Sequence, residues 1–145
     1  MVNGDGRKVI VDTGFLVALF YETDKHHLAA KRWLHQFKGK LISTQQVLTE
    51  TSFFFRPETT AKLIDQITAG WIELHTPDSA GYRRIATLLR KYADLDPDLT
   101  DVALIWLAEA SGIQAILTVD INDFSTYRIN GKSKFELTGW QTFGT

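Results

Sequence analysis

Two apolar runs in this chain each end in an aspartate. The first run, Val9–Val11, precedes Asp12, and the second, Ile116–Val119, precedes Asp120. Neither run alternates polar with apolar residues, which is typical of a strand buried on both faces of a parallel sheet. Parallel strands end along one edge, and ligands bind open α/β sheets beyond that edge. We therefore expect Asp12 and Asp120 to converge at one functional rim.

Two further acids, Glu50 and Asp101, lie at the polar boundaries of apolar helical segments and could join this pair. Asp101 precedes the run 102–110, which is apolar except for Glu109. The start of that helix carries Asp98, Thr100 and Asp101, and one of the three is enough for its cap, which would leave Asp101 free for another role. Four converging carboxylates repel one another unless a positive charge lies between them, and a divalent metal ion is the simplest such charge.

Each of these acids also has a purely structural explanation. Asp12 could be only a helix N-cap, and Asp120 only the acceptor of an Asx-turn. Asp98 and Asp101 together could be only a capping pair. Glu50 is the least specific of the set, because a glutamate on a helix is usually solvated. The position of Asp12 and Asp120 at the ends of two strands favours the functional interpretation.

The segments that would position these acids alternate between strand and helix patterns. The expected strands cover 8–12, 40–43, 71–75 and 115–119, with a short fifth strand from Phe135. The expected helices cover 13–21, 25–37 (capped by Asp24), 45–55, 58–69, 79–92 and 98–111. This alternation predicts an α/β fold with a parallel sheet and right-handed crossovers.

The composition limits the class of protein. With 145 residues, 44% of them hydrophobic, we expect one domain over 1–145 with a real core and a flexible start at Met1–Gly6. The absence of cysteine excludes disulfides, thiolate nucleophiles and cysteine zinc sites, and it fits a cytoplasmic protein. No apolar stretch is long enough for a membrane span. The net charge of −1 argues against bulk electrostatic binding of nucleic acid but permits a local basic patch.

Four motifs together resemble the PIN domain family. They are VIVDTG at 9–14, the helical Glu50, DLTD at 98–101 before an apolar helix, and LTVDINDF at 117–124. Their order and spacing match that family over nearly the whole chain, and the short length looks most like the toxins of VapBC-type toxin–antitoxin pairs. The resemblance implies a three-layer α/β/α sandwich with a central parallel sheet. It also implies a Mg²⁺- or Mn²⁺-dependent ribonuclease that acts on RNA and is held in check by a small antitoxin.

The resemblance further implies a set of catalytic, metal-binding acids and a set of supporting residues. The acids are Asp12 on the first strand, the helical Glu50, Asp101 at the start of the buried helix, and Asp120, where some family members carry asparagine. The supporting residues are Thr13, Asp98, Thr118 and Asp123. Carboxylate oxygens suit Mg²⁺, and one or two such ions can activate water for attack on phosphorus without a protein nucleophile.

Two other functions fit the same acidic rim. One is a housekeeping RNA-processing nuclease without an antitoxin, and the other is a non-catalytic α/β regulatory or binding module. A receiver-like module would need a lysine at a later strand end, and 115–120 contains none. The chain also lacks GxGxxG, P-loop and GxSxG motifs.

Three consecutive phenylalanines, Phe53–Phe55, point to a protein partner. Successive helical residues point about 100° apart, so one apolar stripe cannot bury all three rings. A deeply buried helix, or one that frays before Pro57, is the alternative explanation. Our sharper hypothesis is an apolar surface shared with 58–69, which serves a homodimer, an antitoxin groove, or both.

Overall fold

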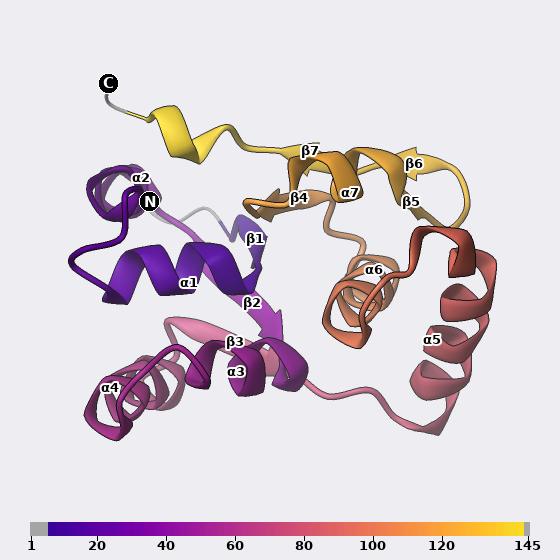
Figure 1. The fold of residues 1–145 in the computed structure, drawn as a ribbon, viewed down its shortest axis with the longest axis horizontal. Coiled ribbons are helices and arrows are strands. Elements are labelled where there is room, and N and C mark those ends of the chain that lie inside the picture. The colour runs from indigo at the N-terminus through magenta and orange to yellow at the C-terminus, as the bar shows by residue number, and fades with distance from the viewer. Residues whose placement is uncertain (1–5, 144–145) are drawn as a thin grey trace.

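Five parallel strands form the central sheet of the computed structural model, which describes residues 6–143. Their order across the sheet is β3-β2-β1-β4-β7 (Figure 1). The strands are β1 (Lys8–Val11), β2 (Lys40–Thr44), β3 (Ile72–His75), β4 (Ala115–Leu117) and β7 (Glu136–Leu137). The predicted α/β class, the parallel sheet and the short fifth strand are confirmed. The expected flexible start falls almost entirely on residues 1–5, outside the described residues.

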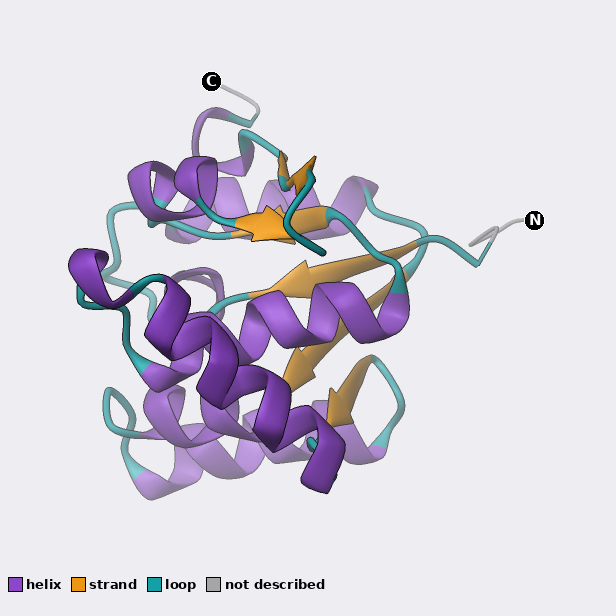
Figure 2. Ribbon diagram, turned by 90° about the vertical axis from the view of Figure 1, so that its right-hand side faces the viewer, coloured by secondary structure: helices purple, strands orange, loops and turns teal. Residues whose placement is uncertain are grey.

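Helices cover both faces of this sheet, so the predicted three-layer α/β/α architecture is also confirmed. They are α1 (Thr13–Phe20), α2 (His27–Gln36), α3 (Gln45–Ser52), α4 (Pro57–Thr68), α5 (Ser79–Lys91), α6 (Leu99–Ser111) and α7 (Ile121–Thr126). Figure 1 shows α1 and α2 on one side of the sheet and α5 and α6 on the other. Figure 2 shows the strands in orange with helices on both sides of them. Within 6–143, no helix combines the length and apolarity that a membrane crossing needs.

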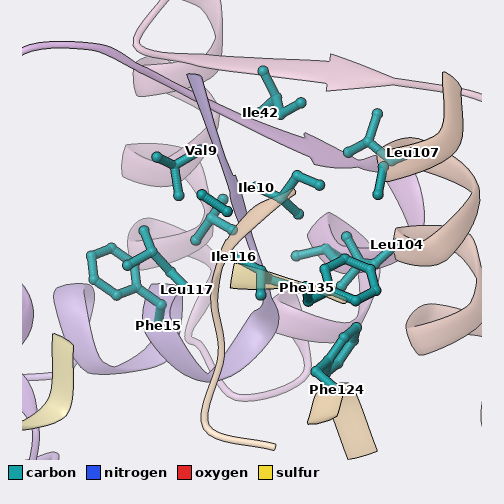
Figure 3. Packing of buried hydrophobic residues seen from close by; sticks show 14 of the residues in the cluster. Val9, Ile10, Phe15, Ile42, Leu104, Leu107, Ile116, Leu117, Phe124 and Phe135 are labelled. Atoms are coloured by element: carbon teal, nitrogen blue, oxygen red, sulfur yellow. The ribbon is translucent and has the colours of Figure 1, made fainter. Parts of the chain in front are cut away.

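The two strands that precede the predicted site, β1 and β4, are buried in the core. Val9, Ile10 and Val11 are fully buried, which is why their run does not alternate with polar residues. Figure 3 shows Phe15 of α1 beside Leu117 on one side of the sheet, with Leu104 of α6 on the other. Each such apolar side chain contributes about 1.5–3 kcal/mol when it is buried. This packing fixes the ends of β1 and β4.

The helix expected over 45–55 ends at Ser52, so the prediction that Phe53–Phe55 are helical was wrong. Pro57 opens α4, and Arg56 before it is extended (φ −73°, ψ 158°), as the proline ring requires. The three phenylalanines therefore occupy a turn between two helices. Two of the rings are exposed, whereas the Phe55 ring lies 6.1 Å from that of Phe20.

Two element boundaries differ from the sequence prediction because side chains capture backbone groups. Asp24 does not cap α2, which begins at His27, because its Oδ1 accepts from the amide of His26 in a preceding turn. β4 stops at Leu117 rather than Val119. The carbonyl of Thr118 accepts hydrogen bonds from two side chains near the C-terminus instead of continuing the strand.

Several short elements were not predicted. They are α7, the hairpin of β5 (Arg128–Ile129) and β6 (Ser133–Lys134), and the 3₁₀ turns η1 (Ala93–Leu95) and η2 (Trp140–Thr142). The hairpin turns at Asn130 and Gly131, both of which have positive φ. An Asn–Gly pair is a strong hairpin signal, so this element was readable from the sequence.

Candidate metal centre

Asp12 lies where β1 ends, beside the end of β4. Val11 is in register with Leu117, and the amide of Asp12 donates to the Leu117 carbonyl (3.0 Å). Both carboxylate oxygens of Asp12 have partners: Oδ1 accepts from the Thr13 amide (2.7 Å) and Oδ2 from the Thr118 hydroxyl (2.8 Å). Asp12 therefore caps α1, as its structural explanation required, and is also held rigidly at the rim. Of the two threonines expected to support the site, Thr118 contacts Asp12 through its hydroxyl, whereas Thr13 does so through its backbone amide.

Asp101 reaches the same place from the first turn of α6. Asp98 caps this helix, because its Oδ1 accepts from the Asp101 amide (2.8 Å), so the Asp101 carboxylate is not needed for the cap. The only hydrogen bond described for that carboxylate comes from the Tyr127 hydroxyl, which lies 3.4 Å from Oδ2. Asp101 is 8% exposed in a helix that is otherwise buried along most of its length. A buried carboxyl with so few donors is stable in its charged form only beside a positive partner, and is otherwise protonated.

Asp120 completes a cluster of three aspartates. Its amide donates to Thr118 Oγ1 (3.0 Å), and the same hydroxyl donates to Asp12, so Thr118 bridges the two acids. Carboxylate oxygens of Asp12, Asp101 and Asp120 lie within 4.8 Å of one another, and Asp120 is the exposed member. The convergence that we expected from the strand ends is present for these three residues.

Glu50 lies outside this group of three but faces the same region. It is half-buried on α3 and lines a hollow together with Thr13 and Asp120. Its charge raises the pKa of both Asp12 and Asp120. The sequence expectation of four acids in one site thus corresponds to three aspartates in close contact and one glutamate facing the same space.

Burial dominates the electrostatics of the cluster, and the charges of neighbouring carboxylates add to its effect. Burial raises the pKa of Asp12 to about 7, although its hydrogen bonds from Thr118 and Thr13 oppose the rise. Burial, followed by the charge of Asp98, raises the pKa of Asp101 to about 8. The pKa of Asp120 is also raised, first by burial and then by Asp123. Among the causes acting on these three carboxyls within 6–143, none is a cation, so the donor set fits a divalent ion that prefers oxygen ligands.

Gly14 follows Asp12 by two residues and packs against Val119, the residue before Asp120. A β-carbon at Gly14 would lie only 2.6 Å from Cγ2 of Val119, so the start of α1 can lie against the β4–α7 turn only because residue 14 is glycine. This contact brings the segments that carry Asp12 and Asp120 together. The motif 9–14 was recognised from sequence, but the packing role of its glycine was not.

Sequence reasoning missed three side chains that hold the acids in place. Tyr127 follows the unpredicted helix α7 and donates to Asp101. Trp140 Nε1 and Gln141 Nε2 both donate to the Thr118 carbonyl, at 3.1 and 2.9 Å. No local pattern marks these residues, because each acts across a long sequence separation.

Comparisons with known proteins agree with this geometry. The chain matches the PIN domain family over residues 9–129. Its fold is similar to VapC20 of Mycobacterium tuberculosis, described as a Sarcin–Ricin loop cleaving toxin. The TM-score is 0.71 at 17% identity, over 79% of this chain and 93% of that one. It is also similar to VapBC2 of Rickettsia felis, a complex bound to a DNA fragment from its promoter. Here the TM-score is 0.57 at 14% identity, over 80% of this chain and 90% of that one.

No curated protein matches the sequence. With the family match spanning most of the chain and the acidic rim in place, the chain belongs to the PIN domain family.

Proposed function

We propose that this protein is a ribonuclease that uses Mg²⁺ or Mn²⁺ and acts in the cytoplasm as the toxin of a VapBC-type pair. The observation that carries the proposal is the meeting of Asp12, Asp101 and Asp120 at the edge of a PIN sheet. These three residues are the proposed metal ligands, with Glu50 acting from the adjoining hollow. The bound ion would supply a water of lowered pKa and positive charge beside the phosphate.

The protein's own contribution is to hold these ligands in a fixed geometry. Thr118 and the Thr13 amide each fix one oxygen of Asp12. Asp98 takes over the helix cap and so leaves the Asp101 carboxylate available, while Tyr127 orients it. Ligands fixed before substrate arrives need little reorganisation during the reaction, and such preorganisation is a large part of catalysis.

The test is the chemistry of the RNA ends. Purified protein is incubated with RNA oligonucleotides, including one with a Sarcin–Ricin loop sequence, in Mg²⁺, in Mn²⁺ and in EDTA. Attack by water predicts ends with a 5′-phosphate and a 3′-hydroxyl, whereas attack by the RNA's own 2′-hydroxyl would leave a 2′,3′-cyclic phosphate.

Asp101→Asn should abolish cleavage with the fold intact, and Asp65→Asn, on the exposed surface of α4, is the matched control. Cyclic ends, cleavage that persists in EDTA, or full activity in Asp101→Asn would contradict the mechanism. Metal-dependent stabilisation without any RNA cleavage would favour the alternative of a non-catalytic binding module.

A small antitoxin is the proposed protein partner, and the likeness to the VapBC2 complex supports it. An apolar hollow of about 370 Å³ lies beside α4 and is lined by Leu19, Phe20, Phe37, Leu41 and Trp71, among others. The Trp71 side chain is 65% exposed. Large exposed aromatics beside an apolar groove are typical of the centre of a protein interface. We propose that an apolar segment of the antitoxin occupies this groove.

The predicted Phe53–Phe55 surface overlaps this groove only in part. Phe55 packs on Phe20, one of the groove residues, but Phe53 and Phe54 do not line it. A homodimer that uses the exposed rings remains a prediction. Light scattering of the protein alone tests the homodimer, and co-purification with the product of an adjacent gene separates a toxin from a housekeeping nuclease.

A further inference from the structure

The hollow that Glu50 shares with the acidic cluster has an apolar as well as an acidic lining. It encloses about 470 Å³ and lies beside the cluster, because Thr13, Glu50 and Asp120 all line it. Two apolar side chains, Phe54 and Val119, also line it. A group bound here would lie directly beside the atoms that a metal ion at Asp120 would contact.

Away from a metal ion at the cluster, the charge of the hollow disfavours a phosphate. Glu50 lines this part of the hollow and would repel a phosphate there, whereas a neutral ligand with N–H donors would be attracted to its carboxylate. Thr13 adds a buried hydroxyl, Oγ1, that has no hydrogen-bond partner among the described residues. The hollow therefore suits a flat, neutral group that has polar edges and an apolar face.

One lysine, Lys25, is among the residues that line the hollow. Lys25, in the loop between α1 and α2, lines it, is exposed, and makes no ion pair in the part of the chain that the structure describes. A flexible ammonium at the rim is well placed to contact a backbone phosphate outside the acidic interior.

Phe54 is an exposed aromatic side chain in the lining of the hollow, where a base could stack on its ring. Its side chain is 59% exposed, because α3 ends at Ser52 and the following turn carries the ring out of the core. Phe53, the preceding residue, is 78% exposed but does not line the hollow. Aromatic side chains that stand beside a nucleic-acid track bind unpaired bases by stacking on them.

We propose that this hollow is a nucleobase subsite, an inference that rests on the proposed ribonuclease function. The base next to the scissile phosphate leaves its stack and packs on Phe54. Its amine edge faces Glu50 and Thr13, and Lys25 contacts the adjoining backbone phosphate. The nucleotide at this position must then be unpaired. Bases with an exocyclic amine, which are adenine, cytosine and guanine, are preferred over uracil.

The experiment pairs a change in the ring with a change in the base. Cleavage kinetics are measured for a single-stranded oligonucleotide and for versions with an abasic nucleotide on either side of the cut. Loss of one stacked base should raise KM for the wild type by about 5- to 150-fold at one of the two positions, with kcat little changed. In Phe54→Ala the KM for the intact oligonucleotide should already be raised, and the abasic change should raise it much less than in the wild type, because only the contacts of the amine edge are left to lose.

Two variants serve as controls. Phe53→Ala should retain the wild-type response to the abasic change, and Phe54→Trp should restore it. Thermal melting of each variant shows that the fold is intact, which the exposure of both rings leads us to expect.

Each alternative result has a definite meaning. A wild type that cuts RNA but tolerates abasic nucleotides on both sides overturns the subsite alone. So does a Phe54→Ala variant that keeps the full response. If both alanine variants lose the response equally and also change the oligomeric mass, the rings form a protein interface and the subsite is wrong. A wild type that cuts no RNA refutes the proposed function and the subsite with it.

Discussion

Replacing Asp12 with asparagine should stabilise the metal-free protein, and the gain should depend on pH. Burial raises the pKa of Asp12 to about 7, against an ordinary value near 4. A rise of about three pKa units corresponds to about 4 kcal/mol, since each unit is worth about 1.36 kcal/mol. Below pH 4 the carboxyl is protonated in both states and carries no penalty. As the pH rises from 4 to 7 the unfolded state releases its proton first, so the free energy of unfolding falls, and above pH 7 the penalty is complete.

Asparagine removes the charge but also one hydrogen bond. Its amide oxygen can still accept from the Thr13 amide, but its NH₂ group cannot accept from the Thr118 hydroxyl, a loss of about 1 kcal/mol. At pH 9 the net gain for Asp12→Asn is therefore about 3 kcal/mol, or roughly 6–12 °C in melting temperature. At pH 5 only about 1.5 kcal/mol of the penalty is present, so variant and wild type should differ by less than about 1 kcal/mol.

The assay is thermal and urea denaturation in EDTA at pH 5 and pH 9, repeated with Mg²⁺. Mg²⁺ should raise the melting temperature of the wild type at pH 9, because a ligand that binds only the native state stabilises it, and should do so far less in Asp12→Asn. Asp65→Asn on the exposed face of α4 controls for removal of any carboxylate and should change stability by less than about 0.5 kcal/mol. Parallel pH profiles for wild type and Asp12→Asn, or an equal response to Mg²⁺, would refute the reasoning.

Three further predictions concern other residues. Thr118→Val removes the hydroxyl that donates to Asp12 and accepts from the Asp120 amide, so it should lower kcat for RNA cleavage roughly 10- to 100-fold and the free energy of unfolding by about 1–3 kcal/mol; an unchanged kcat would contradict the positioning role. Glu109→Gln should lower the free energy of unfolding by about 1–3 kcal/mol in urea titrations, because Arg84 loses a carboxylate bound at 2.7 and 3.0 Å. An unchanged urea midpoint would show that this ion pair makes no net contribution to stability. Trp71→Ser should leave stability within about 0.5 kcal/mol but abolish co-purification with the antitoxin, and retained binding would exclude the apolar groove.

A site residue could be predicted from the sequence when the strand or helix that carries it also fixes where its side chain lies. Asp12 and Asp120 were predicted together because buried parallel strands end at one edge, and the register of Val11 with Leu117 bears this out. Asp101 was separable from the helix cap because Asp98, Thr100 and Asp101 all stand at the helix start and one of them suffices; the structure shows that Asp98 is the cap. Glu50 could be placed only on a helix, since nothing local says which way a half-buried glutamate faces.

The sequence by itself determined the α/β class and the sheet edge at which Asp12 and Asp120 lie, because local periodicity depends on neighbouring residues. Only the tertiary structure decided that three aspartates meet while Glu50 lines the adjoining hollow. Likewise, only the fold showed that Phe54 lines that hollow and Phe53 does not. It also brought Tyr127, Trp140 and Gln141 to the acids, with Gln141 reaching Thr118 across 23 residues of chain. Such contacts depend on how helices and turns pack, and packing is set by the whole core rather than by any local pattern.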